Sequence, residues 1–132
     1  LIIVQVDAAD RIYADYDRFI QIMVNLTQNA IQFTKNGTIT LSSFPDGDQQ
    51  IIQVKDTGIG IEKKDITSIW ERFYKVDVSR KNTKFGESGI GLAVVQSLVM
   101  NHKGTIDVES NPGEGTIFTI TLPTKAAIEK NS

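Results

Sequence analysis

Apolar residues recur at two spacings along the chain, and these spacings predict both helices and strands. From Asp15 onward they return every three or four residues, which predicts a long helix with Asp15 as its N-cap and an end near Gly37 in the left-handed conformation. Two further helices are expected, over residues 62–74 and from Gly89 to about His102. The positions that carry the period of the first helix are Ile20, Met23, Leu26, Ala30 and Ile31.

Short apolar or alternating runs between these segments predict strands. They cover residues 1–6, 38–44, 49–56, 104–110 and 116–122, with turn-forming residues between consecutive pairs. Together the elements predict an α+β fold, a two-layer sandwich with a mixed sheet of about five strands and three helices on one face. We expect one domain over residues 1–123, a mobile loop over about 75–88 and a polar tail over 124–132.

Composition narrows the possible functions. The 132 residues are 40% hydrophobic and 23% charged, which is typical of one globular domain. A net charge of -2 provides no general attraction to nucleic acid or anionic membrane, and the absence of cysteine excludes disulfides and thiolate chemistry. No apolar run reaches the roughly 18 residues that span a bilayer. The chain starts at Leu1, so we expect a piece of a longer protein, in which a membrane anchor remains possible.

One face of the first predicted helix carries amides and no charge. Amide side chains offer an oxygen that can ligate Mg²⁺ and a nitrogen that can donate to phosphate. The pattern also fits an ordinary exposed polar face, and the helix alone does not distinguish the two. The amide positions are Gln21, Asn25, Gln28, Asn29 and Gln32.

A first glycine-rich segment, Asp56-Thr-Gly-Ile-Gly-Ile61, directly follows a predicted strand. Gly58 and Gly60 permit positive φ and close approach of a ligand to the backbone. The carboxylate of Asp56 could accept a hydrogen bond from the exocyclic amine of adenine, whereas guanine would present a carbonyl there. A simple tight turn explains the glycines equally well.

A second glycine-rich segment, Gly86-Glu-Ser-Gly-Ile-Gly-Leu92, leads into the helix that starts at Gly89. Free N–H groups and the helix dipole favour an anion at such a start. The preceding loop is basic, with Lys75, Arg80, Lys81 and Lys84, and suits a lid over a triphosphate. A solvated charged loop would explain the lysines but not the glycines. A P-loop, a dinucleotide fingerprint and the eukaryotic protein-kinase signatures are absent from the sequence.

In this order, the segments resemble the catalytic domain of bacterial sensor histidine kinases, within the ATPase group that includes type II topoisomerases and heat-shock chaperones (the Bergerat or GHKL ATP-binding fold). Residues 15–33 resemble the N box, 56–61 the G1 box, 70–74 the F box, and 86–123 the G2 box with a closing hairpin. The match extends from about residue 4 to residue 123.

The resemblance implies a role for each matching position. Asn25 and Asn29 would hold Mg²⁺ and the phosphates of ATP. Asp56 would bind the adenine amine, and Lys75 and Arg80 would meet the β- and γ-phosphates. The remaining ATP-binding positions it implies are Phe33, Gly58, Gly60, Ile61, Ser88, Gly89, Ile90, Gly91, Leu92 and Thr116.

Two positions depart from the family pattern. Gln32 stands where many relatives carry Lys or Arg, which would weaken one phosphate contact or move it to Lys35. Glu87 replaces a common glycine and puts an acid near the phosphates.

Hydrolytic relatives place a glutamate base where this chain has Asn25, so the site should orient ATP but activate water poorly.

The implied activity is transfer of the γ-phosphate of ATP to a histidine that this chain does not contain. His102, its only histidine, is interpreted as a cap or surface residue. The resemblance implies as partners a dimerisation domain of the same parent protein and a response regulator, with a homodimeric parent anchored in the bacterial membrane and this fragment monomeric and cytoplasmic. The alternatives are a serine kinase or ATPase of the same fold, and a non-catalytic binding module.

Overall fold

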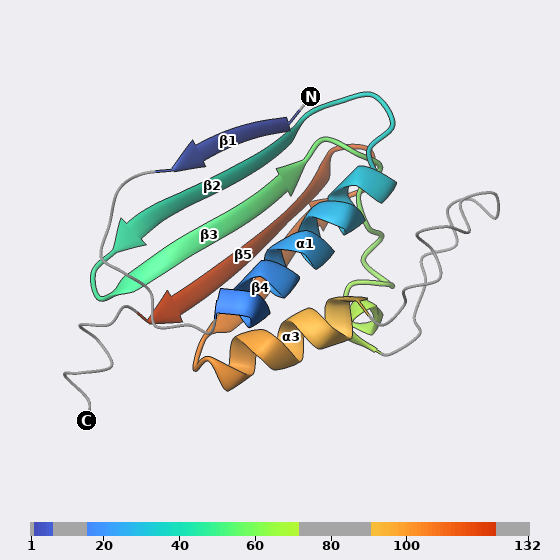
Figure 1. Cartoon of the computed structure of the whole chain (residues 1–132). Coiled ribbons are helices and arrows are strands. Elements are labelled where there is room, and N and C mark those ends of the chain that lie inside the picture. The colour runs from blue at the N-terminus through green and yellow to red at the C-terminus, as the bar shows by residue number, and fades with distance from the viewer. Residues whose placement is uncertain (1, 7–15, 72–90, 124–132) are drawn as a thin grey trace.

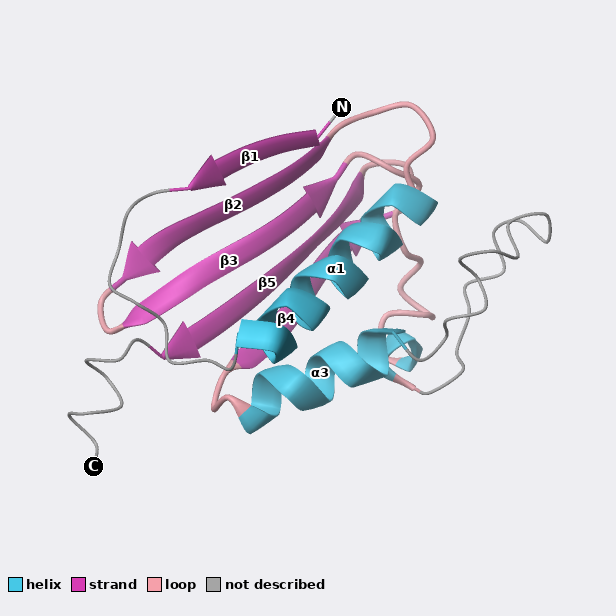
Figure 2. Ribbon diagram, viewed as in Figure 1, coloured by secondary structure: helices cyan, strands magenta, loops and turns pink. Residues whose placement is uncertain are grey.

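The computed structural model describes residues 2–6, 16–71 and 91–123. Figure 1 shows five strands forming one sheet and two α-helices packed against one of its faces. The other face of the sheet carries no described helix (Figure 2). In chain order the elements are β1 (Ile2–Val6), α1 (Tyr16–Gln32), β2 (Ile39–Asp46), β3 (Gln49–Asp56), the 3-10 helix η1 (Ser68–Trp70), α3 (Gly91–Asn101), β4 (Thr105–Asn111) and β5 (Gly115–Pro123).

The sheet has the strand order β1-β2-β3-β5-β4. β2, β3, β5 and β4 pair with one another in antiparallel fashion, and β1 adds to the edge of β2 in parallel. The hairpin between β2 and β3 turns at Gly47, whose φ is +61°. This is the predicted α+β two-layer arrangement, with four antiparallel strands and one parallel edge strand, but the described residues form two α-helices and not the three expected.

The hydrophobic core lies between the helical layer and the sheet. Because residues four apart share one helix face, α1 buries Ile22, Leu26 and Ala30 in succession. The predicted helical period is confirmed, but Ile20 and Ile31 are more than 40% exposed. α1 packs against α3 as well as the sheet, so its buried arc is turned away from these two residues. The strands and α3 contribute Ile39, Ile52, Val54, Val95, Val99, Phe118, Ile120 and Leu122.

The helix predicted over residues 62–74 is wrong for its described part. Residues 63–67 form turns, and only Ser68–Trp70 is helical, as a 3-10 helix. Most of the backbone hydrogen bonds here join residues three apart, such as Ser68 N–H to the Asp65 carbonyl at 3.0 Å. Asp, Thr and Ser favour caps and turns over helix interiors, and three such residues precede Ile69. Residues 72–74 lie outside the described residues.

The end of α1 differs from the expected glycine termination. Gly37 does not have a positive φ; its missing Cβ instead gives room to the Thr57 side chain. α3 ends in a Schellman motif, in which Lys103 takes φ +61° and the Gly104 N–H donates to the Val99 carbonyl. Gly104 is needed because a Cβ there would meet the Thr121 backbone. The Asp15 N-cap, the loop 75–88, the helix residues 89 and 90 and the tail 124–132 lie outside the described residues.

Candidate functional site

Three polar residues lie side by side across one end of the sheet. Thr116 on β5 pairs directly with Asp56 on β3 and with Ser110 on β4. Direct partners in an antiparallel sheet point to the same face, so this polar row faces the helical layer. The next row on that face, two residues along, is Val54–Phe118–Val108. The alternation of the strands therefore places the polar row at the edge of the core.

The Asp56 carboxyl is buried at the last position of β3, with only 3% of the residue exposed. Burial raises its pKa above the ordinary 3.8, because desolvation opposes the ionised form. Hydrogen bonds from the backbone N–H groups of Gly58 and Thr116 act in the opposite direction and favour the carboxylate. The Gly58 N–H donates to Oδ1 at 2.9 Å, which fixes the orientation of the carboxyl group.

The loop that follows Asp56 is held tightly between α1 and the β4–β5 turn. The Ile59 N–H donates to the Phe33 carbonyl at 3.1 Å, and the Ile59 carbonyl accepts from Gly113 N–H at 2.7 Å. Gly60 has φ +75°, and a Cβ there would meet the Asn111 backbone. Gly58 is required for another reason, since its φ is not positive and a Cβ would meet the Phe33 carbonyl. The two glycines thus allow three backbone segments to approach closely.

Ser110 connects this loop to the strands. Its hydroxyl accepts from the Ile61 N–H at 2.7 Å and donates to the Gly115 carbonyl at 2.8 Å. The same oxygen lies 2.8 Å from Thr116 Oγ1. Ser110 was not among the predicted site residues, although the sequence carries a signal for it. It continues the alternation of Ile106 and Val108 with a hydroxyl where a third apolar side chain is expected.

The amide face of α1 turns toward α3. Asn25 Nδ2 donates to the Gly91 carbonyl at 3.5 Å, at the start of α3. A carbonyl cannot donate, so this contact orients the amide nitrogen toward Gly91 and leaves the Asn25 oxygen for another partner. Asn29, one turn further along α1, is half-buried. The remaining amide residues differ in exposure, since Gln32 is half-buried and Gln21 and Gln28 are exposed.

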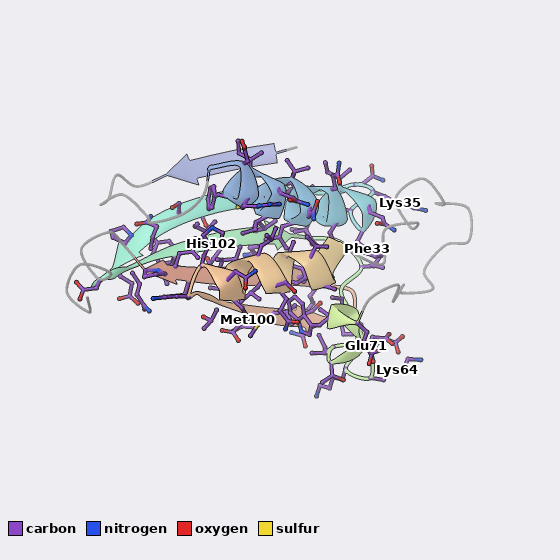
Figure 3. All side chains as sticks on the ribbon, turned by 60° about the horizontal axis from the view of Figure 1, so that its bottom comes forward. Phe33, Lys35, Lys64, Glu71, Met100 and His102 are labelled. Atoms are coloured by element: carbon purple, nitrogen blue, oxygen red, sulfur yellow. The ribbon has the colours of Figure 1, made fainter. Side chains whose placement is uncertain are left out.

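Figure 3 shows Phe33 and Lys35 at the end of the helical layer where α3 begins, and His102 at the opposite end. Phe33 is half-buried and Lys35 exposed. His102 Nδ1 lies 2.7 Å from the Leu98 carbonyl, so the ring caps the last turn of α3. The cap interpretation of His102 is confirmed.

The predicted site residues thus fall into two described groups and one group outside the described residues. The two described groups lie toward the same end of the molecule, where β3 ends, α1 ends and α3 begins (Figure 1). Around the end of β3 lie Phe33, Asp56, Gly58, Gly60, Ile61 and Thr116. Between α1 and α3 lie Asn25, Asn29, Gly91 and Leu92, the last of which is half-buried against the core. Outside the described residues lie Lys75, Arg80, Ser88, Gly89 and Ile90.

A buried hydrogen-bond acceptor beside a glycine loop, next to an amide-bearing helix, is suited to binding a base at one end and polar groups of the same ligand at the other. The fold and site therefore define an α+β domain of the nucleotide-binding class. A family model described as histidine kinase-, DNA gyrase B- and HSP90-like ATPase matches residues 14–126. The chain belongs to this family of ATPase domains.

Its relatives narrow the family to sensor histidine kinases. The chain is 53% identical over 125 residues to "Sensor histidine kinase YclK" of Bacillus subtilis, covering 95% of this chain and 26% of that protein. It is 40% identical over 117 residues to "Circadian input-output histidine kinase CikA" of Synechococcus elongatus, covering 88% and 15%. The chain therefore spans about a quarter or less of these relatives.

Solved structures agree with the fold. Full-length ShkA in complex with AMPPNP superposes with a TM-score of 0.81 at 30% identity, covering 93% of this chain and 25% of that one. The catalytic domain of histidine kinase ThkA, nucleotide free, superposes with a TM-score of 0.77 at 25% identity, covering 93% and 79%. The domain has the fold of histidine kinase catalytic domains. None of the helices in the described residues is both long and apolar enough to cross a membrane.

Proposed function

We propose that this domain binds Mg-ATP and donates the γ-phosphate to a histidine on a dimerisation domain of its parent protein. The observation that carries the proposal is the buried Asp56 carboxyl at the end of β3, oriented by the Gly58 N–H at 2.9 Å. Desolvation opposes the ionised form of this carboxyl and raises its pKa, so holding it at this buried position has a cost. A hydrogen-bond donor on a ligand, such as the exocyclic amine of adenine, would bind to this acceptor.

The donor set between the helices fits Mg²⁺ and phosphate. With its nitrogen on the Gly91 carbonyl, Asn25 has an oxygen to offer, and Asn29 is half-buried one turn away. Amide oxygens are hard ligands of the kind that Mg²⁺ takes together with phosphate oxygens and water. When bound, the metal would neutralise negative charge on the phosphates. Lys75 and Arg80 are proposed to add positive charge from the lid, and the backbone of Gly89 and Gly91 to add N–H donors.

The chemistry proposed for this site is positioning rather than activation of water. Asn25 stands where a hydrolytic relative would have a glutamate base, and an amide does not take a proton at neutral pH. In-line transfer then depends on orientation and on charge neutralisation. We propose that His102 is not the acceptor, because its Nδ1 is bound to the last turn of α3, at the end of the helical layer away from Phe33.

The proposed partners follow from the relatives, which are sensor kinases several times longer than this chain. A dimerisation domain carrying the phosphoacceptor histidine would lie elsewhere in the parent, and a response regulator would receive the phosphoryl group. We propose a homodimeric parent, anchored in the bacterial membrane, with this domain on the cytoplasmic side. The isolated fragment is expected to be a monomer that does not phosphorylate itself.

The proposal is tested in two steps. Calorimetry with ATP, with and without Mg²⁺, should give tighter binding in the presence of the metal, and Asn29→Ala should remove that difference. Gln28→Ala, on an exposed neighbouring amide, is the matched control and should retain it. Persistence of the metal dependence in Asn29→Ala would move the Mg²⁺ site elsewhere.

In the second step the fragment is mixed with ATP and a separately made dimerisation domain from the parent. The expected product is acid-labile phosphate on that domain, which is the signature of phosphohistidine. Acid-stable phosphoserine, or release of inorganic phosphate without transfer, would favour the serine kinase or ATPase alternative and contradict the proposed activity.

A further inference from the structure

We propose that Ser110 is a positioning residue that makes the Thr116 hydroxyl a hydrogen-bond acceptor and thereby strengthens the selection of adenine over 6-oxopurines. The inference rests on the proposed function of ATP binding and adds a residue that touches neither the phosphates nor the metal. It starts from the polar row Asp56–Thr116–Ser110, in which Ser110 is the member with three neighbours.

The direction of each hydrogen bond follows from counting protons. A serine hydroxyl has one proton and two lone pairs. The Ile61 N–H can only donate, so it occupies one lone pair of Ser110 at 2.7 Å. The Gly115 carbonyl can only accept, so it takes the single proton at 2.8 Å. What remains on Ser110 is one lone pair.

The 2.8 Å contact between the two hydroxyls then has only one possible direction. Thr116 must donate its proton to Ser110, because Ser110 has no second proton to give. Thr116 Oγ1 is therefore left with lone pairs alone for any other partner. Two backbone groups, the Ile61 N–H and the Gly115 carbonyl, thus decide through Ser110 which way the Thr116 hydroxyl donates.

The row then presents acceptors to a ligand from two adjacent strands. The Asp56 carboxylate is one acceptor, and Thr116 Oγ1 is the other; their backbones pair directly across β3 and β5. The 6-amino group of adenine carries two protons and suits two acceptors, directly or through water. The oxygen of a 6-oxo group is itself an acceptor, so it would face these two acceptors without a hydrogen bond. Such a mismatch is costly in a buried site. Without Ser110, the Thr116 hydroxyl could rotate and donate to the oxo group.

The test compares ATP with ITP, whose base carries a carbonyl in place of the 6-amine and, with it, a proton on N1. Dissociation constants by calorimetry should show that the wild type prefers ATP. Ser110→Ala should lower the ATP-to-ITP preference by about 5- to 10-fold, the scale of one hydrogen bond. Ser110→Thr keeps the hydroxyl and should restore most of the preference. Thr119→Val is the matched control. Thr119 lies on the same strand as Thr116, and the change removes a hydroxyl that accepts a hydrogen bond from Gln53 Nε2.

A double-mutant cycle separates this role from a purely structural one. If Ser110 acts through Thr116, then Ser110→Ala should leave the ATP-to-ITP ratio unchanged in a Thr116→Val background. Equal weakening of both nucleotides by Ser110→Ala, with the ratio intact, would overturn the proposal. If Ser110→Ala does not fold, the Thr116→Val variant tests the proposal alone. Loss of the Thr116 acceptor should lower the ATP-to-ITP ratio, and an unchanged ratio would overturn the proposal.

A failure of the proposed function gives a different result. A wild type that binds neither nucleotide would contradict ATP binding and, with it, the selectivity. A wild type that prefers ATP but keeps that preference in Ser110→Ala would leave ATP binding standing and remove only the role of Ser110. Hydrogen exchange of the Ile61 amide in the nucleotide-free protein checks the geometry separately, and Ser110→Ala should accelerate it.

Discussion

Two neighbouring rows of the same sheet face the same helices but are built from opposite chemistry. The polar row is Asp56–Thr116–Ser110, and the apolar row, two residues along each strand, is Val54–Phe118–Val108. Asp56 and Thr116 are almost as buried as Val54 and Phe118. Burial alone therefore does not distinguish the rows.

The difference lies in what holds each row in place. The apolar row is stabilised by removal of surface from water, which has no direction, and by the edge-to-face contact of Phe118 with Trp70 at a centroid distance of 5.9 Å. The polar row is held by directional hydrogen bonds, and the Asp56 carboxyl at its end is buried at a cost that appears as a raised pKa. One row supplies stability, while the other gives up some of it to present a specific hydrogen-bonding pattern.

The largest expected effect is on the apolar row. Phe118→Ala should lower the free energy of unfolding by about 3–5 kcal/mol, because it leaves a cavity beside Trp70 at a fully buried site. Urea unfolding followed by circular dichroism measures the change. Ile117→Ala, on the other face of the same strand and only half-buried, is the control and should cost clearly less. Equal losses at the two positions would contradict the assignment of the core to the helix-facing side.

The next effect, on the polar row, should have opposite signs for binding and for stability. Asp56→Asn should weaken ATP binding by about 2 kcal/mol, roughly 30-fold, because the amide presents a donor to the adenine amine. The same change should raise the melting temperature at pH 7, since it removes a buried ionised group. Asp107→Asn, on an exposed carboxylate of β4, should change neither quantity appreciably.

The sign of the stability change depends on pH. The folded state holds the Asp56 proton more tightly than the unfolded state, so the wild type is least penalised below pH 3.8 and loses stability as pH rises through the raised folded pKa. The advantage of Asp56→Asn should therefore vanish below pH 3.8 and grow above it, while wild-type ATP affinity falls on acidification through the same window. Melting curves at several pH values measure this, and a pH-independent difference would contradict burial as the cause.

The smallest effect concerns a hydroxyl close to the polar row. Among the described residues, buried Thr34 Oγ1 has no hydrogen-bond partner, and it lies next to the missing Cβ of Gly58. Thr34→Val removes the unpaired group at nearly constant volume and should stabilise the fold by up to about 1 kcal/mol. Thr57→Val is the opposed control, because Thr57 Oγ1 accepts from the Thr38 N–H at 2.9 Å and its loss should destabilise. Chemical unfolding compares the two, and destabilisation by both would mean that Thr34 has a partner in solution.

Local sequence patterns were sufficient to predict most helices and strands and the glycine-rich segment after β3. The α1 period, the strands and the Asp56-to-Ile61 segment were all predicted, because spacing and turn chemistry act over a few residues. The helix over 62–74 was wrong, since its apolar spacing hid a run of cap-forming residues that gave turns instead. The phase of α1 was wrong at Ile20 and Ile31, because the position of α3 decides which arc of the helix is buried.

Residue types and their local order were enough to predict the class of fold, the family resemblance and the kinds of group at the site. Which of these groups meet became known from the folded structure alone. Ser110 lies 49 residues from Ile61, and Asn25 lies 66 residues from Gly91. The register of three strands places a carboxyl and two hydroxyls in one row. The hydrogen bonds of Ser110 in that row then require the Thr116 hydroxyl to donate its proton to Ser110. Such contacts are set by strand pairing and packing, which no short pattern in the chain records.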